Sequence, residues 1–121
     1  MNPLTIIGID PSLRRQLSTL RASCVKVADD EKLTGCCAAV ALMVKAVCGG
    51  VILKGAVNGW QHYWNLLPCG NEIDLTSTQF GGNGWRPLAA GVEAENDPAL
   101  IPISFLLFAR DTLATLEQVN P

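Results

Sequence analysis

The sequence predicts a single α+β domain in which helices pack against one antiparallel sheet. Its 121 residues are 49% hydrophobic and 17% charged, a balance that suits one compact domain. Two segments with helical spacing come first, and three short runs rich in β-forming residues follow them. Helices and strands that are segregated along a chain are typical of α+β domains. Residues 1–121 are therefore expected to form one domain.

The first helix is expected to begin near Asp10. An aspartate can cap the free amides of a helix, and the proline that follows it is tolerated in the first turn. Leu13, Leu17, Leu20 and Cys24 then recur at helical spacing and predict a buried face. The arginines of this segment are interpreted as part of its solvated face: Arg14, Arg15 and Arg21.

The second helix is expected within residues 36–48, which are apolar on nearly every side. Gly49 and Gly50 supply its C-terminal stop. A helix without a polar face has to be surrounded by the rest of the domain. The segment is shorter than the roughly 20 apolar residues that cross a membrane, so we expect a core helix and no membrane association.

A meander of three antiparallel strands is expected next, over residues 51–57, 60–67 and 72–80. Asn-Gly at 58–59 and Pro-Cys-Gly at 68–70 supply the turns between them. Each strand is expected to pair with the one that precedes it.

The last third of the chain predicts a loop and then a helix. Residues 81–102 are rich in Gly, Pro and Asn, which is typical of a loop. Ser104 can cap a final helix, with one face formed by Phe105, Phe108, Leu113 and Leu116.

Composition and charge argue against several classes of function. Nine basic and eleven acidic residues give a net charge of -2, without the basic excess typical of proteins that bind nucleic acid. The N-terminal residues do not resemble a signal peptide, so we expect a cytoplasmic protein. The five cysteines are odd in number, so we expect them to be free thiols. They lack C-x-x-C spacing, so we expect no bound metal, and we expect no cofactor.

Cys37, His62 and Asp74 are the candidate catalytic residues. Cys37 stands in the expected first turn of the second helix, where free amides and the helix dipole favour the negative charge of a thiolate. His62 is the one histidine of the chain, and Asp74 stands on the next expected strand.

The turn between these two strands decides whether His62 and Asp74 can meet. If residues 68–70 form a three-residue turn, Leu67 pairs with Asn71. The two side chains then lie on the same face as diagonal neighbours, within reach of each other. A two-residue turn would place them on opposite faces.

The three residues would form a nucleophilic triad for acyl transfer. Cys37 would attack a carbonyl, His62 would take the thiol proton and deliver it to the leaving group, and Asp74 would orient the imidazole. The amide at the helix start would supply one oxyanion donor. Gln61 and Gln16 are both candidates for the second.

Each candidate also has a simpler interpretation. A free cysteine is often a core residue, a strand histidine can be a packing partner, and an aspartate can bind turn amides. Trp60, Gln61 and Trp64 are expected to contact substrate in a groove beside His62, although aromatic residues of strands also fill cores.

Two stretches resemble the YunG-like family of small bacterial proteins: residues 35–42 (GCCAAVAL) and residues 62–80 (HYWNLLPCGNEIDLTSTQF). The family pattern is similar to G-Q-C-A-x-x-A-L and H-Y-W-N-x-L-P-x-G-x-x-x-D-L-T-x-x-Q-F. The resemblance implies a papain- or transglutaminase-like thiol fold and the triad of Cys37, His62 and Asp74. This chain departs from the pattern at Cys36, where the family has a glutamine whose amide could be a donor.

These observations predict a cysteine-nucleophile hydrolase or acyltransferase that acts on an amide bond of a peptide or protein. Two alternatives stay open. One is a catalytically inactive binding module that keeps the fold, and the other is a toxin or antagonist domain that modifies another protein. The reactivity of the Cys37 thiol separates the first prediction from the inactive module.

Overall fold

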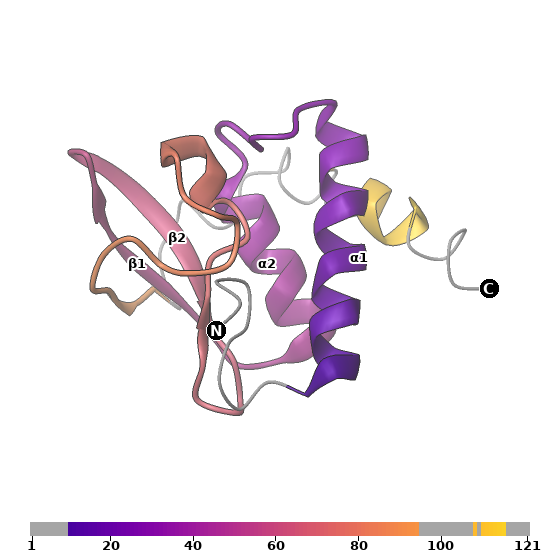
Figure 1. Ribbon diagram of the computed structural model, residues 1–121, viewed down its shortest axis with the longest axis horizontal. Coiled ribbons are helices and arrows are strands. Elements are labelled where there is room, and N and C mark those ends of the chain that lie inside the picture. Colours follow the sequence, from indigo (N-terminus) through magenta and orange to yellow (C-terminus); the bar gives the residue numbers. More distant parts are fainter. Residues whose placement is uncertain (1–9, 95–107, 109, 116–121) are drawn as a thin grey trace.

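The computed structural model describes residues 10–94, 108 and 110–115. Its elements, in chain order, are α1 (Pro11–Ala28), α2 (Cys37–Cys48), β1 (Val51–Val57), β2 (Trp60–Leu66), β3 (Glu72–Ile73), the 3-10 helix η1 (Ser77–Phe80) and β4 (Val92–Glu93). The strands form one antiparallel sheet in the order β3-β2-β1-β4. In Figure 1, α2 lies between this sheet and α1. The predicted α+β arrangement, with helices on one side of an antiparallel sheet, is confirmed.

Helix α1 has the predicted start. The Asp10 carboxylate accepts a hydrogen bond from the amide of Ser12, and the helix ends at Asp29, which has a left-handed φ of 53°. Leu17, Leu20 and Cys24 form its buried face, as predicted. None of the helices within the described residues has the length and apolar character that a membrane crossing needs.

The predicted solvated arginine face is wrong for Arg21. This side chain is half-buried and donates to the carbonyl oxygens of Leu75 (3.0 Å) and Glu31 (2.9 Å) and to the hydroxyl of Thr78 (3.1 Å). Helical spacing placed Arg21 on the polar side, but the turn before α2 and the segment after β3 both fold against that side. Arg21 therefore ties α1 to these two segments.

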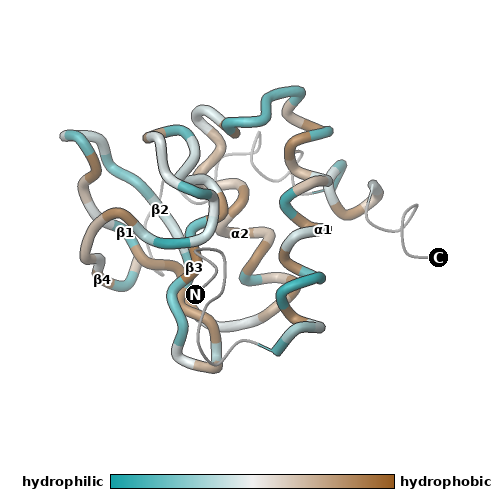
Figure 2. The backbone as a smooth tube through the Cα atoms, viewed as in Figure 1, coloured by the Kyte–Doolittle hydropathy of each residue, from teal (hydrophilic) through white to brown (hydrophobic). Residues whose placement is uncertain are grey.

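Helix α2 is enclosed because nearly all its residues are apolar. Six of its twelve residues are buried, and Figure 2 shows hydrophobic residues along its length between the sheet and α1. One part of the core joins α1 and α2, and a second part joins α2 to residues of the sheet such as Ile52 and Tyr63. The helix is therefore fixed on both sides, which determines where its first residue, Cys37, lies.

Strands β1 and β2 form the predicted hairpin. Asn58 and Gly59 both have positive φ (53° and 80°), which a type I′ turn requires. The resulting register pairs Gly55 with His62. The tight turn thus sets the position of His62 on the sheet.

The third strand is much shorter than the predicted range of residues 72–80. Its pairing with β2 is as expected for a three-residue turn, because Leu66 pairs with Glu72. The amide of Leu67 donates to the carbonyl of Asn71 at 2.9 Å, and Gly70 has the left-handed φ of 91° that this turn requires. The strand then ends because the Asp74 carboxylate accepts the amide of Thr76, which turns the chain into η1. The alternating β-forming residues gave no sign of this turn.

The region predicted as a loop contributes the fourth strand. Val92 and Glu93 pair with β1, and the amide of Ala94 donates to the carbonyl of Ile52 at 2.9 Å. A strand of two residues is too short to leave a periodic pattern in the sequence.

The final helix is described only at residues 108 and 110–115, which are helical. Phe108 packs against the core as predicted, whereas Leu113 is 40% exposed and does not belong to a buried face. Ser104, Phe105 and Leu116 lie outside the described residues.

Gly55 provides a test of how the sheet positions the site. A Cβ atom at this residue would lie 2.7 Å from the Trp64 ring and 2.6 Å from the carbonyl oxygen of Ala90. We expect Gly55→Ala to lower the free energy of unfolding by about 1–3 kcal/mol, because an overpacked site has to shift. Urea denaturation measures this change. The matched control, Ala56→Ser at the exposed neighbouring position, should stay within about 0.5 kcal/mol of the parent.

Candidate active site

His62 and Asp74 form a buried hydrogen-bonded pair. The His62 Nε2 atom lies 2.7 Å from the Asp74 Oδ2 atom, and both side chains are 0% exposed. The two residues come together because the turn at residues 68–70 places β3 in the predicted register. The pairing predicted from the sequence is confirmed.

The other carboxylate oxygen of Asp74 is occupied as well. Oδ1 accepts from the amide of Thr76 at 3.1 Å and from its hydroxyl at 3.2 Å, while the amide of Asp74 donates to the carbonyl of Trp85 at 2.9 Å. The simpler interpretation of Asp74, that it binds turn amides, is thus also correct. Oδ2 contacts His62 and Oδ1 binds Thr76, so the carboxylate is held in one orientation toward His62.

Two aromatic rings fix the imidazole of His62. Trp64 lies stacked at 5.8 Å between ring centroids with an interplanar angle of 29°, and Phe80 meets the ring edge-on at 4.9 Å and 86°. Trp64 is itself 2% exposed, and its indole nitrogen donates to the Glu72 carboxylate at 2.9 Å. Trp64 therefore packs against His62, while its predicted contact with substrate stays a prediction.

Cys37 is the first residue of α2 and is half-buried. The capping residue Cys36 makes no side-chain hydrogen bond to the helix amides. The first amides of any α-helix have no acceptor within the helix, so this uncapped start offers donors beside the Cys37 sulfur. The thiol packs against the cluster that contains Tyr63 and also contacts the His62 ring. Since Asp74 occupies Nε2, the nitrogen left for Cys37 is Nδ1.

The surroundings of His62 favour its charged form. Burial opposes the charge and would lower the pKa, but hydrogen bonds and charge interactions with Asp74 and Cys37 outweigh burial and raise the pKa of His62 from 6.5 to about 9. At neutral pH the imidazole therefore carries a proton on each nitrogen. It can then stabilise a negative charge on the adjacent sulfur.

Sequence reasoning missed Gln79. Its side-chain nitrogen lies 3.3 Å from His62 Nδ1, and its side-chain oxygen accepts from the amide of Gly35 at 3.2 Å. Gln79 thus links the imidazole to the loop that precedes α2, and η1 lies beside that loop in Figure 1. The residue stands in the stretch that resembles the YunG-like pattern, five positions after Asp74, but a continuous strand there would not have suggested this contact.

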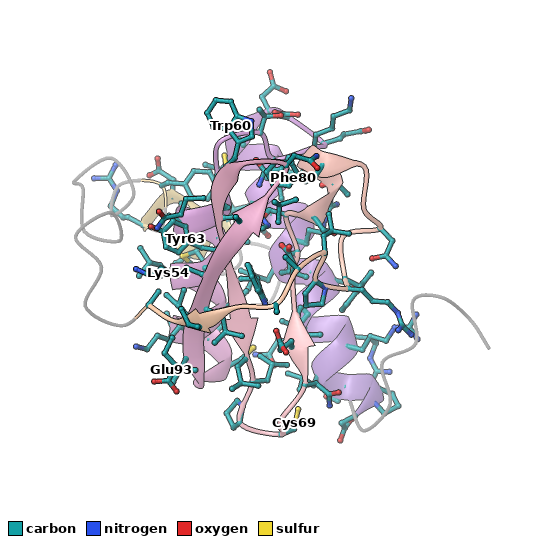
Figure 3. The ribbon with its side chains drawn as sticks, turned by 90° about the vertical axis from the view of Figure 1, so that its left-hand side faces the viewer. Lys54, Trp60, Tyr63, Cys69, Phe80 and Glu93 are labelled. Atoms are coloured by element: carbon teal, nitrogen blue, oxygen red, sulfur yellow. The ribbon has the colours of Figure 1, made fainter. Side chains whose placement is uncertain are left out.

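Trp60 and Gln61 lie near the turn of the β1-β2 hairpin. Trp60 is 71% exposed, and Figure 3 places it at the end of the sheet opposite Cys69. The Gln61 side-chain nitrogen donates to the Tyr63 hydroxyl at 2.7 Å. Their predicted role in substrate binding stays a prediction.

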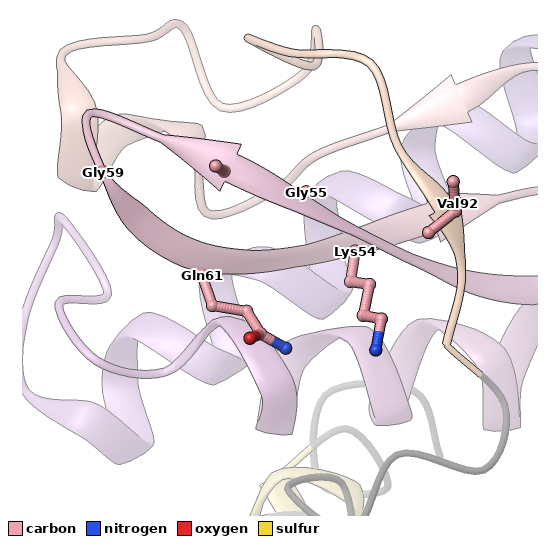
Figure 4. Close-up of a pocket in the computed structure, with 6 residues that line it drawn as sticks. Lys54, Gly55, Gly59, Gln61 and Val92 are labelled. Atoms are coloured by element: carbon pink, nitrogen blue, oxygen red, sulfur yellow. The ribbon is translucent and has the colours of Figure 1, made fainter.

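A hollow of about 400 Å³ lies against the hairpin. Figure 4 shows the side chains of Lys54 and Gln61 extending to the same side of the strands. Gln61 connects this hollow to Tyr63, which belongs to the cluster that Cys37 packs against. The lining residues are Lys54, Gly55, Ala56, Gly59, Gln61 and Val92.

The other four cysteines differ from Cys37 in their surroundings, although all five are free thiols. Burial raises the pKa of Cys24 to about 12 and also raises the pKa of Cys36 and of Cys48. At exposed Cys69, hydrogen bonds from Asn71 lower the thiol pKa. Within the described residues, no three His, Cys, Asp or Glu side chains are grouped so that they could hold a metal ion.

Comparison with known proteins identifies the family of this chain. The YunG protein family matches residues 13–102, which run from α1 past β4 and include all three candidate catalytic residues. The chain belongs to the YunG family. No curated protein and no solved structure matches it. This YunG-family match extends beyond the two stretches on which the resemblance was based.

The charged state of His62 can be tested directly, because the chain has one histidine. In untagged protein, an NMR titration of the imidazole should give a midpoint near 9 for the parent. Asp74→Asn removes the carboxylate that raises this pKa and should lower the midpoint by at least about one unit. Asp111→Asn, at an exposed position of the final helix, should leave it unchanged. A parent midpoint near 6.5 would contradict the assigned pairing.

The same pair predicts how stability depends on pH. Because the pKa of His62 is raised on folding, its contribution is fully present below about pH 6.5 and is lost as the pH rises through about 9. Urea denaturation under reducing conditions, between about pH 6 and about pH 10, should therefore show a decline in stability for the parent. His62→Gln should decline less steeply. Parallel declines for the two proteins would contradict this prediction.

Proposed function

We propose that this YunG-family protein is a thiol enzyme that acts on amide or related acyl bonds through Cys37, His62 and Asp74. The observation that carries the proposal is the buried contact between Nε2 of His62 and Asp74 at 2.7 Å. It leaves Nδ1 of the same ring to Cys37 at the uncapped start of α2. A nucleophile, a proton carrier and a residue that orients the carrier are the three parts of such a triad.

The reaction would proceed in two steps. The Cys37 sulfur bonds to the carbonyl carbon, the thiol proton resides on Nδ1 of His62, and the electron pair of the C=O π bond moves to the oxygen. The C=O bond then re-forms, the C–N bond breaks, and Nδ1 gives its proton to the leaving nitrogen. Water or an amine attacks the thioester carbon in the second step, and His62 accepts the proton of that nucleophile as the new C–O or C–N bond forms. The C=O bond then re-forms, the C–S bond breaks, and Cys37 leaves as a thiolate beside the protonated ring, which restores the starting pair. Asp74 keeps the ring oriented throughout.

The papain- and transglutaminase-like identity of the fold belongs to this proposal. Its support is the order of the elements, with the cysteine at the start of a central helix, the histidine on a following strand and the aspartate just after the next. Five free thiols are compatible with action in the cytoplasm, where cysteines stay reduced.

The proposed substrate is a peptide or protein amide. The hollow beside β1 and β2 offers room for part of such a substrate, and its lining combines apolar residues with the Lys54 amine and the Gln61 amide. Mixed linings of this kind are typical of sites that both accommodate and orient a ligand. Trp60 at the hairpin turn would extend the contact surface.

The reactivity of Cys37 tests the proposal. We expect iodoacetamide at neutral pH to label Cys37 at least about tenfold faster than exposed Cys69, because the charged His62 ring stabilises the reacting sulfur. His62→Ala should remove this advantage. Site-resolved mass spectrometry of the alkylated peptides measures both rates in one sample.

Cys69 serves as the control, since its rate should be the same in both proteins. Slow labelling of Cys37 that His62→Ala leaves unchanged would overturn the proposal. An inactive binding module with the same fold would then be the better interpretation.

A further inference from the structure

Backbone amides and side-chain donors often act together on the oxyanion of acyl transfer, and the start of α2 supplies the backbone amides here. The two glutamines considered from the sequence do not lie beside His62 in the way a second donor requires. Gln16 is exposed on α1, and the Gln61 side-chain nitrogen donates to the Tyr63 hydroxyl. The Cys36 thiol is directed to the carbonyl of Thr34 at 3.6 Å.

The side chain of Gln79 is in the required place. Its nitrogen lies 3.3 Å from Nδ1 of His62. Asp74 occupies the other ring nitrogen, and Cys37 interacts with the same ring. With Nε2 bound to Asp74, Nδ1 is the ring nitrogen left for both Cys37 and Gln79, and we infer from this that the amide nitrogen lies on the side of the ring where the sulfur reacts. The oxygen of a carbonyl group bonded to that sulfur would come within reach of the amide.

The amide is also held in the required orientation. The backbone N–H of Gly35 can only donate, so the Gln79 oxygen has to face it, and their distance is 3.2 Å. The NH₂ group is thereby directed toward His62. Gly35 is two residues before Cys37, so this tether fixes Gln79 relative to the start of α2 itself.

We propose that the Gln79 side-chain amide is the second oxyanion donor of the Cys37 site. This inference rests on the proposed thiol chemistry and adds a catalytic residue to it. The N–H directed to Nδ1 can use that atom as an acceptor only while the ring is neutral. When Nδ1 carries the proton, the same N–H has no acceptor on the ring and can bind an oxyanion. Since His62 is charged at neutral pH, this donor is available before the reaction begins.

Two reagents separate oxyanion stabilisation from thiol reactivity. Acetylation of Cys37 by 4-nitrophenyl acetate passes through a tetrahedral oxyanion, whereas alkylation by iodoacetamide at a saturated carbon does not. We expect Gln79→Met, which keeps the chain length and removes the amide, to slow acetylation by about 100-fold, the effect of losing one oxyanion donor. Alkylation of Cys37 should change by less than about threefold. The same substitution at Gln16 should alter neither rate.

Because both rates are measured on one folded sample, their ratio is independent of the amount of active protein. Gln79→Glu keeps an acceptor for Gly35 and lacks the N–H donor, so it should also slow acetylation more than alkylation. It serves as the second variant if Gln79→Met unfolds.

The outcomes distinguish the inference from the proposed function. Acetylation that persists at the parent rate in both Gln79 variants would overturn the role of Gln79, as would an equal loss of both rates, which would make Gln79 a positioning residue. If Cys37 of the parent reacts no faster than Cys69 with either reagent, the thiol chemistry itself fails and the inference with it.

Discussion

The buried contact between His62 and Asp74 is the interaction on which the site depends. Removing charged groups from water costs several kcal/mol per ion, so such a pair is stable only when its remaining hydrogen-bonding capacity is satisfied. Thr76 satisfies the second oxygen of Asp74, and Trp64 and Phe80 enclose the ring of His62. Nδ1 is left to face Cys37. The same side-chain packing that completes the sheet therefore also holds the imidazole and the carboxylate of the proposed site in place.

The early end of β3 is what brings the remaining parts together. Asp74 binds the amide of Thr76 and diverts the chain into η1, instead of continuing along β2. From η1, Gln79 reaches both His62 and the loop before α2. Arg21 secures the same region from α1, through Leu75 and Thr78 on one side and Glu31 on the other. A longer β3 would have kept Gln79 on the strand and removed its link to the loop before α2.

Much of the site could be predicted because it depends on local turn chemistry. Pro-Cys-Gly favours a turn of three residues that ends in a left-handed glycine. The length of this turn sets which residues of β2 and β3 share a face. The role of Gln79 could not be predicted, since it depends on contacts with Gly35 and His62, which are 44 and 17 residues away in the chain. The same holds for Arg21, whose partner Leu75 is 54 residues away.

Spacing and turn residues within a few positions of each other were enough to predict the two long helices, the β1-β2 hairpin and the pairing of β2 with β3. The folded structure was needed to show where β3 ends, that residues 92–93 form a strand, and which side chains enclose His62. These features depend on burial and on hydrogen bonds between distant segments. Local preference is too weak to specify such contacts, so the sequence alone did not predict them.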